Sequence, residues 1–253
     1  MRFARGFFVC AALALSGTAS AVPVFTDNFA SATEGSNLGG RAPQVGNAWA
    51  VPVPTTGVPV HTTTATGDTA LPYVETQGAE RQIRASWNAP LSAGQTITVS
   101  VPLRPSSGNF WAGNAGFALQ DATGNTTAAF FGSSADGTLG DQAHGFQIAN
   151  TEAGGAQILS TSNSDQTQTL KVTYVYDTGL TTLTVGNNVA SVSGTYASQV
   201  PVSQIYLHNN GGADFRFQGL TVDVTPEPAS AGLLSVGAIG LLVRRRKQGP
   251  ARS

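Results

Sequence analysis

The sequence predicts an all-β fold, an antiparallel β-sandwich or jelly roll. Short runs in which apolar and polar residues alternate recur along the chain, and Gly, Asn, Asp or Pro bounds each run. Between residues 22 and 225, no stretch has the periodicity of a helix. The chain is 41% hydrophobic and only 11% charged, so it has enough apolar side chains for a packed core. Many short strands without helices between them are typical of two sheets packed face to face.

The alternating runs form a single predicted domain, residues 22–225. We expect its strands at residues 24–29, 48–53, 58–63, 70–76, 81–87, 95–104, 114–121, 126–132, 144–150, 155–161, 168–177, 181–186, 189–194, 203–208 and 214–225. The threonine-rich stretch Thr55–Thr69 has a second interpretation, a flexible segment.

A three-stranded meander over residues 168–194 is the clearest local pattern. Apolar residues alternate with polar ones from Leu170 to Tyr176. Asp177-Thr178-Gly179 then predicts a hairpin turn, and Asn187-Asn188 predicts the next turn, because glycine and asparagine tolerate positive φ.

The closing stretch, residues 214–225, contains a change of parity. Its apolar residues switch from odd to even positions: Phe215 and Phe217, then Leu220, Val222 and Val224. A β-bulge at Gln218-Gly219 would bring all of them to one face, because a bulge shifts the register by one residue. Glycine permits the backbone conformation that such a bulge needs.

Residues 1–21 have the layout of a cleaved secretory signal peptide. Arginines precede an apolar run, Phe7–Leu15, and the small residues Ala19 and Ala21 form the expected cleavage site. The apolar run is much shorter than the roughly 20 residues that a membrane span needs. Because Cys10 lies in this segment, the exported body would contain no disulfide and would depend on its core for stability.

The C-terminal residues 226–247 have a different pattern. Pro226, Glu227 and Pro228 hold the backbone extended. Residues 229–243 carry no charge, and a basic cluster follows them: Arg244, Arg245, Arg246 and Lys247. At about 1.5 Å per residue the uncharged segment is shorter than a hydrocarbon core of about 30 Å. Since the basic cluster would stay on the cytoplasmic side, we expect a single short transmembrane helix.

This order of Pro-Glu-Pro, apolar segment and basic cluster resembles the PEP-CTERM sorting signal of Gram-negative bacteria. The resemblance implies processing by an exosortase, a membrane protease, while the helix holds the chain transiently in the inner membrane. It also implies delivery to the cell surface or extracellular matrix in organisms that make exopolysaccharide. An ordinary C-terminal anchor is the alternative.

The body is acidic once the two ends are set aside. It holds 6 of the 13 basic residues and 13 of the 14 acidic residues, a formal charge of −7 between Val22 and Thr225. Its one lysine is Lys171. Nucleic-acid-binding proteins gather Lys and Arg on one face, so this composition excludes nucleic acid as a partner.

The body also resembles the concanavalin-A-like lectin and glucanase (LamG-type) sandwiches. The resembling features are Asp27-Asn28-Phe29, Leu38-Gly39-Gly40-Arg41 followed by Trp49, the hairpin LKVTYVYDTGLTTLTVG, and a closing strand expected beside the first. Enzymes of this fold carry the motif E-x-D-x-x-E, which the sequence lacks, and it also lacks a G-x-S-x-G nucleophile elbow.

The remaining ionisable residues have no catalytic spacing. Glu75 and Glu80 are expected near a turn as solvated surface charge. The three histidines follow no metal-ligand spacing and are expected in turns or at sheet edges: His61, His144 and His208. We therefore expect no catalysis.

Two patterns concern ligands. Phe110, Trp111 and Asn114 lie in a loop of small polar residues, where an exposed aromatic ring stacks on a sugar and an amide orients it. The alternative is that either ring points inward and fills the end of the sandwich. Four residues in Gly-rich turns offer oxygen ligands for calcium: Asp121, Asn125, Asp136 and Asp141. Turn formation is the simpler explanation of these four, and no other cofactor is expected.

These patterns together predict an exported, non-enzymatic surface or matrix protein that binds exopolysaccharide or forms part of the matrix. The alternative is a glycoside hydrolase or polysaccharide lyase with an unrecognised site. A surface protein with a purely structural role is a third hypothesis.

Overall fold

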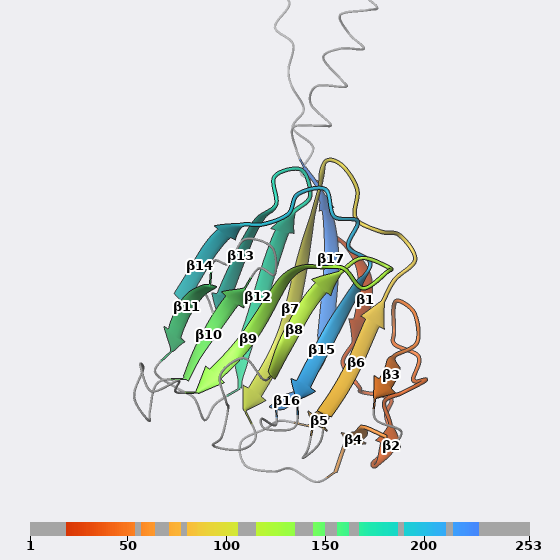
Figure 1. Ribbon diagram of the computed structural model, residues 1–253. Coiled ribbons are helices and arrows are strands. Elements are labelled where there is room, and N and C mark those ends of the chain that lie inside the picture. The colour runs from red at the N-terminus through yellow and green to blue at the C-terminus, as the bar shows by residue number, and fades with distance from the viewer. Residues whose placement is uncertain are drawn as a thin grey trace, which may run out of the picture. The chain divides into compact units, whose positions relative to one another are not determined.

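A computed structural model describes residues 19–53, 57–63, 71–76, 80–105, 115–134, 144–149, 156–161, 167–186, 190–210 and 215–227. The regular elements among these residues are all β-strands, and they form two antiparallel sheets (Figure 1). The chain divides into a compact unit, residues 21–225, which holds the sheets, and a second unit formed by the two ends. The predicted all-β sandwich is confirmed.

The larger sheet contains ten of the described strands. They are β1 (Val22–Asp27), β2 (Ser36–Asn37), β4 (Pro59–His61), β5 (Tyr73–Thr76), β7 (Gln95–Pro105), β12 (Gln168–Val175), β13 (Leu180–Val185), β14 (Ala190–Thr195), β16 (Phe215–Phe217) and β17 (Leu220–Pro226). Their order is β14-β13-β12-β7-β16-β5-β4-β2, and β17 pairs with both β7 and β1.

The smaller sheet contains seven of the described strands and lies nearer the viewer in Figure 1. They are β3 (Ala50–Val53), β6 (Glu80–Ser86), β8 (Ala115–Gln120), β9 (Thr126–Ser134), β10 (His144–Ala149), β11 (Ala156–Thr161) and β15 (Gln204–Asn210). Their order is β11-β10-β9-β8-β15-β6-β3, so β15 lies in the interior of this sheet between β8 and β6.

The predicted strands match the observed ones closely, with two differences. β2 was not predicted, because a strand of two residues is too short to show alternation. The predicted closing strand, residues 214–225, is divided into β16 and β17.

One core fills the space between the sheets. Along β7, Ile97, Val99 and Val101 are fully buried, whereas the residues between them are partly exposed. They belong to the same cluster as Ile83 of β6 and Leu207 of β15 in the facing sheet. Each such side chain contributes roughly 1.5–3 kcal/mol when it is buried. Since residues 22–225 contain no cysteine, this burial is the main stabilising term.

The predicted meander is confirmed. β12 pairs with β13 and β13 with β14, both antiparallel. The predicted hairpin turn ends at Gly179, which has φ of 69°. A side chain at this position would collide with the carbonyl oxygen of Tyr196, so glycine is needed for space as well as for conformation. The predicted Asn187-Asn188 turn lies outside the described residues.

The parity change in the closing stretch is also confirmed. Phe215 and Phe217 of β16 and Leu220 of β17 are all buried on the core side, and the break falls at Gln218 and Gly219. Here the closing strand breaks in two. Both parts pair with β7 on one side, but on the other side β16 pairs with β5 and β17 pairs with β1. Gly219 has φ of 155°.

The first and last strands lie side by side, as the sequence predicts. In the antiparallel pair β1–β17, Val22 is opposite Val224 and Asp27 is opposite Leu220. The start of β1 and the end of β17 are therefore neighbours at one end of the larger sheet.

Asp27, at the end of β1, forms hydrogen bonds with Phe29, Arg41 and Trp49, which belong to the sequence stretches that resemble the lectin-type sandwiches. Its fully buried carboxylate accepts hydrogen bonds from Nε of Arg41 at 3.0 Å, Nε1 of Trp49 at 2.7 Å and the backbone N of Phe29 at 2.9 Å. The Trp49 ring packs edge-on against Phe25, with ring centroids 5.0 Å apart. This cluster holds the loop after β1 against the core.

Candidate functional site

The loop residues expected to bind sugar, Phe110, Trp111 and Asn114, lie outside the described residues. Asp136 and Asp141 of the calcium pattern also lie outside them. These parts of the two ligand hypotheses therefore remain predictions.

Asp121 and Asn125, the other half of the calcium pattern, lie in the turn between β8 and β9. Oδ1 of Asp121 accepts hydrogen bonds from the backbone N of Thr123 at 2.8 Å and of Asn125 at 3.0 Å, and Oδ2 accepts one from Nδ2 of Asn125. Desolvation raises the pKa of Asp121, but the hydrogen bond from the Thr123 hydroxyl and those from the two backbone N–H groups and Asn125 Nδ2 outweigh it and leave the pKa below its usual value. Turn formation thus accounts for both residues. In the described part of the chain, no three His, Cys, Asp or Glu side chains gather as a metal site would require.

The prediction that Glu75 is a solvated surface charge is wrong. Glu75 lies on β5, is only 7% exposed, and its Oε1 accepts hydrogen bonds from Arg216 of the adjacent strand β16. The Oε1 distances are 2.8 Å to Nε and 2.7 Å to Nη2 of Arg216. The Arg216 guanidinium also lies over the Tyr73 ring, 5.5 Å from its centroid. A buried carboxylate needs such a partner, so the Arg216 charge is committed to Glu75.

A second polar cluster surrounds His61 of β4, near the edge of the larger sheet. The His61 ring stacks on Tyr73, with centroids 4.9 Å apart, and its Nδ1 is 3.1 Å from Oε1 of Glu34. Oε2 of Glu34 accepts hydrogen bonds from the backbone N of Thr62 and Thr63. These bonds, the one from Thr62 first, lower the pKa of Glu34 to about 2. The acceptor oxygens of Glu34 are therefore already hydrogen-bonded to His61, Thr62 and Thr63.

The third polar cluster lies on the outer face of the smaller sheet. His208 was expected in a turn or at an edge, but it lies on β15, which has a paired strand on either side. His144 likewise begins β10, an interior strand. The His208 ring stacks on Tyr206, with centroids 5.5 Å apart and planes 16° apart. Because alternate residues share a face, both partly exposed rings lie opposite the buried side chain of Leu207.

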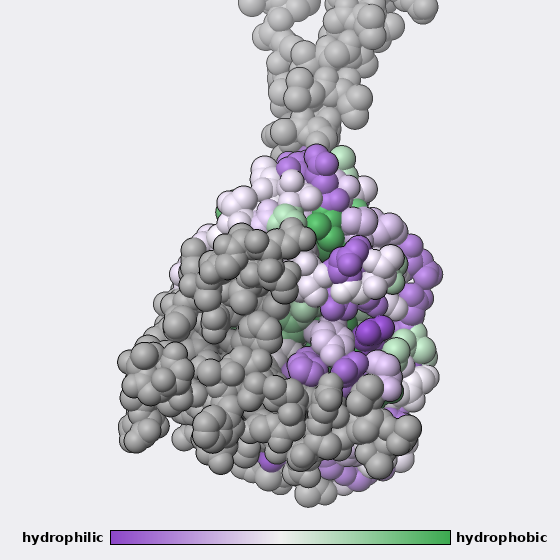
Figure 2. Space-filling view, viewed as in Figure 1, coloured by the Kyte–Doolittle hydropathy of each residue, from purple (hydrophilic) through white to green (hydrophobic). Residues whose placement is uncertain are grey.

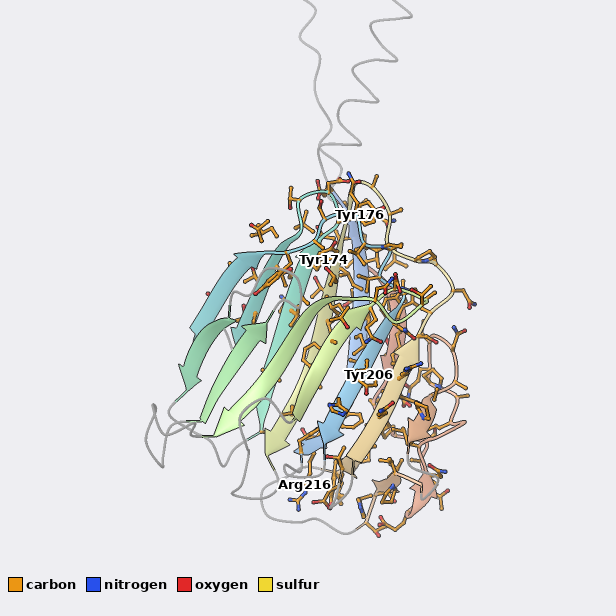
Figure 3. All side chains as sticks on the ribbon, viewed as in Figure 1. Tyr174, Tyr176, Tyr206 and Arg216 are labelled. Carbon is orange, nitrogen blue, oxygen red and sulfur yellow. The ribbon has the colours of Figure 1, made fainter. Side chains whose placement is uncertain are left out.

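Two residues of β6 complete this cluster. Arg84 lies directly opposite Tyr206 in the antiparallel pair, and Gln82 lies opposite His208. The Arg84 guanidinium carbon is 5.6 Å from the Tyr206 ring centroid, a cation–π contact. We call Gln82, Arg84, Tyr206 and His208 the β6–β15 patch, and Figure 3 shows Tyr206 on the sheet nearer the viewer.

Small residues flank the β6–β15 patch. On β8, Ala118 is opposite Tyr206 and Gly116 is opposite His208, and on β3 Ala50 is opposite Arg84. These neighbours are too short to cover the larger side chains from the sides. Figure 2 shows hydrophilic atoms at the surface over β6 and β15.

Sequence reasoning missed the β6–β15 patch, although each half of it was visible. Tyr206 and His208 occupy the polar positions of one predicted strand, and Gln82 and Arg84 occupy those of another. An aromatic residue at the solvent-facing position of a strand is the signal that could have found it. What the sequence does not show is that these two strands are neighbours.

Some of the predicted processing residues are described by the structure. Ala19 and Ala21 precede β1, and Pro226 is the exposed last residue of β17. Pro228 and the basic cluster Arg244, Arg245, Arg246 and Lys247 are outside the described residues, as is the expected C-terminal helix. Within the part of the chain that is described, no helix is long and apolar enough to cross a membrane.

Comparison with known families confirms the sorting signal. Residues 224–247 match the model of the PEP-CTERM protein-sorting motif, which begins two residues before the predicted boundary. The chain therefore carries a PEP-CTERM sorting motif. No curated protein matches the chain as a whole.

Solved structures with a similar fold include the CBM2 module of the evolved Dit protein of Lactobacillus casei BL23 phage J-1. It is 12% identical with a TM-score of 0.49, over 83% of this chain and 98% of that one. A legume lectin-like domain from Entamoeba histolytica is 11% identical with a TM-score of 0.42, over 69% and 88% of the two chains. The alginate lyase AlyC3 in complex with dimannuronate is 10% identical with a TM-score of 0.43, over 61% and 74%. At TM-scores below 0.5, these likenesses carry no function over to this chain.

Proposed function

We propose that this protein is an exported, non-catalytic polysaccharide-binding protein of the cell surface or extracellular matrix, and that the β6–β15 patch is its binding surface. The observation that carries the proposal is the cluster of Arg84, Tyr206 and His208 on the outer face of the smaller sheet, where the Tyr206 ring contacts both other side chains. Side chains on adjacent strands are held more firmly than those on loops, which suits a binding surface.

The chemistry of the β6–β15 patch suits a sugar chain. Aromatic rings offer apolar area to the C–H face of a sugar ring, and polar groups beside them fix its orientation. Tyr206 and His208 supply the rings, while Gln82 and Arg84 supply amide and guanidinium donors. The donors and rings lie on one face, so a single sugar unit can contact both kinds.

The sorting motif supports the destination in this proposal. A chain with a PEP-CTERM signal would be processed by an exosortase at the inner membrane and then delivered outside the cell. Polysaccharide is abundant in that location in bacteria that make exopolysaccharide. The uncharged segment at residues 229–243 would hold the chain in the membrane during processing.

A binding assay with a point variant tests the proposal. The purified full chain, in a detergent without a sugar headgroup, is screened against neutral and acidic polysaccharides, and the affinity for each bound polymer is measured by calorimetry. We expect Tyr206→Ala to weaken binding about tenfold or more, because stacking on an aromatic ring contributes 1 kcal/mol or more.

Tyr176→Ala is the matched control. Tyr176 is a partly buried tyrosine just after β12, in the other sheet (Figure 3), and its loss should leave binding unchanged. Binding to no polysaccharide in the screen would contradict the proposal. Release of reducing ends or of unsaturated products from a polymer would favour the hydrolase or lyase alternative.

A further inference from the structure

The charge of Arg84 differs from that of the other two arginines whose side chains are described. Arg41 is paired with Asp27 at 3.0 Å, and Arg216 is paired with Glu75 at 2.7 Å. Among the described residues, no carboxylate pairs with Arg84. Its Nε is buried and has no hydrogen-bond partner, and its guanidinium lies over the Tyr206 ring.

This arrangement leaves hydrogen-bonding capacity for a ligand. A guanidinium carries donors in a planar fork that matches the two oxygens of a carboxylate. The contact with Tyr206 restricts the plane of the guanidinium, so less side-chain entropy is lost when a ligand binds.

The charge of the rest of the body makes a local cation necessary for an anionic ligand. With a formal charge of −7 between residues 22 and 225, the body repels polyanions over its surface as a whole. Lys171 lies on β12 of the larger sheet, away from β6 and β15 in the strand order. Among the basic side chains that the structure describes, Arg84 is therefore the one that can attract an acidic polymer to the β6–β15 patch.

We infer that the β6–β15 patch binds acidic polysaccharide, and that Arg84 recognises the carboxylate of a uronic-acid unit whose ring lies against Tyr206 and His208. This inference rests on the proposed function and specifies its ligand class. Gln82, opposite His208, is placed to orient the hydroxyl groups of the same or the adjoining unit.

The test compares uronic-acid polymers with their uncharged counterparts. The full chain is titrated with polygalacturonate, polymannuronate and hyaluronate, each beside the same polymer after chemical reduction of its carboxylates to primary alcohols. Neutral polysaccharides are included as a separate set. We expect at least one acidic polymer to bind, and its reduced form to bind at least about tenfold more weakly, since a hydrogen bond to a charged group contributes that much.

Variants assign the effect to Arg84. Arg84→Gln should weaken binding of the acidic polymer at least about tenfold and weaken binding of its reduced form by a smaller factor, because only the acidic polymer loses a charged hydrogen bond. Arg84→Lys keeps the charge but loses the planar fork, so its affinity should lie between those of the wild type and Arg84→Gln. Lys171→Gln removes the same charge from the exposed side of the other sheet and should have no effect. Thermal denaturation shows that each variant is folded.

The outcomes separate the inference from the proposed function. Equal binding of native and reduced polymers, or binding of neutral polysaccharides alone, would overturn the carboxylate inference and leave the proposed function standing. Equal losses in Arg84→Gln and Lys171→Gln would also overturn it, because they would indicate attraction to overall charge. Binding of no polymer of either kind would overturn the proposed function itself.

Discussion

At the scale of single residues, the acidic groups of this body differ in what they do. Asp27 and Glu75 are buried and each neutralises one arginine. Glu34 accepts hydrogen bonds from the backbone that follows β4, and Asp121 accepts them within its own turn. The Asp27–Arg41 and Glu75–Arg216 pairs therefore stabilise the fold. Arg84, by contrast, lies on a sheet face without a described carboxylate partner, which is why it is the candidate for a ligand rather than for the fold.

Loss of the buried Asp27 carboxylate should destabilise the fold. We expect Asp27→Asn to lower the free energy of unfolding by about 2–3 kcal/mol. Nε of Arg41 and Nε1 of Trp49 donate to Oδ2 of Asp27, and the backbone N of Phe29 donates to Oδ1. Asparagine replaces one of these acceptor oxygens with an NH2 donor, so at least one buried donor is left without an acceptor. Urea denaturation followed by tryptophan fluorescence measures the change.

Asp223→Asn is the control for the Asp27 prediction. Asp223 is only partly buried on the adjacent strand β17, so the same chemical change there should alter stability by less than about 0.5 kcal/mol. Equal losses in the two variants would show that the buried hydrogen bonds of Asp27 do not stabilise the fold.

At the scale of elements, a single glycine sets where the closing strand divides. A Cβ at Gly219 would be 2.8 Å from the backbone oxygen of Asp27, so only glycine allows β17 to approach the end of β1. The break lets β7 pair with β16 and β17 in turn while the strand beyond them changes from β5 to β1. It also brings the aromatic side chains of β16 and the aliphatic ones of β17 into one core.

Gly219→Ala should therefore destabilise the protein more than a change that adds only backbone strain. We expect a loss of about 2 kcal/mol or more in the free energy of unfolding, because strained φ and close contact act together. Gly124→Ala is the matched control, since Gly124 has φ of 92° but no atom within 4 Å of an added Cβ. It should lose only about 1 kcal/mol. Equal midpoints of urea denaturation for the two variants would contradict the close-contact argument.

At the scale of the whole molecule, the sequence predicts what is local and misses what depends on strand neighbours. Alternation identified most strands, and the switch of parity identified the break at Gly219, because both are properties of adjacent residues. The Glu75–Arg216 pair was missed because its members are 141 positions apart in the sequence. The β6–β15 patch was missed for the same reason, since Arg84 and Tyr206 meet only once β6 and β15 are paired.

The pairing of the first and last strands also limits where the chain can be processed. Val22, the residue after the predicted signal cleavage site, is opposite Val224, and Phe25 is opposite Val222. Removal of residues 1–21 leaves β1 complete. A C-terminal cut before Val222 would take away the strand that pairs with Phe25 and would expose a side chain that is now fully buried.

We therefore expect the exported, processed protein to begin at Val22 and to retain every residue through Thr225, so that any exosortase cut falls at or beyond Pro226. Intact-mass spectrometry of the protein recovered from the cell surface or medium measures both ends. A chain in which Pro226, Glu227 and Pro228 are replaced by alanine is the control, because β17 still reaches Thr225 while the sorting residues are lost. That variant should stay unprocessed in the membrane fraction with a folded body. A stable processed product that ends before Val222 would contradict the limit that β17 sets.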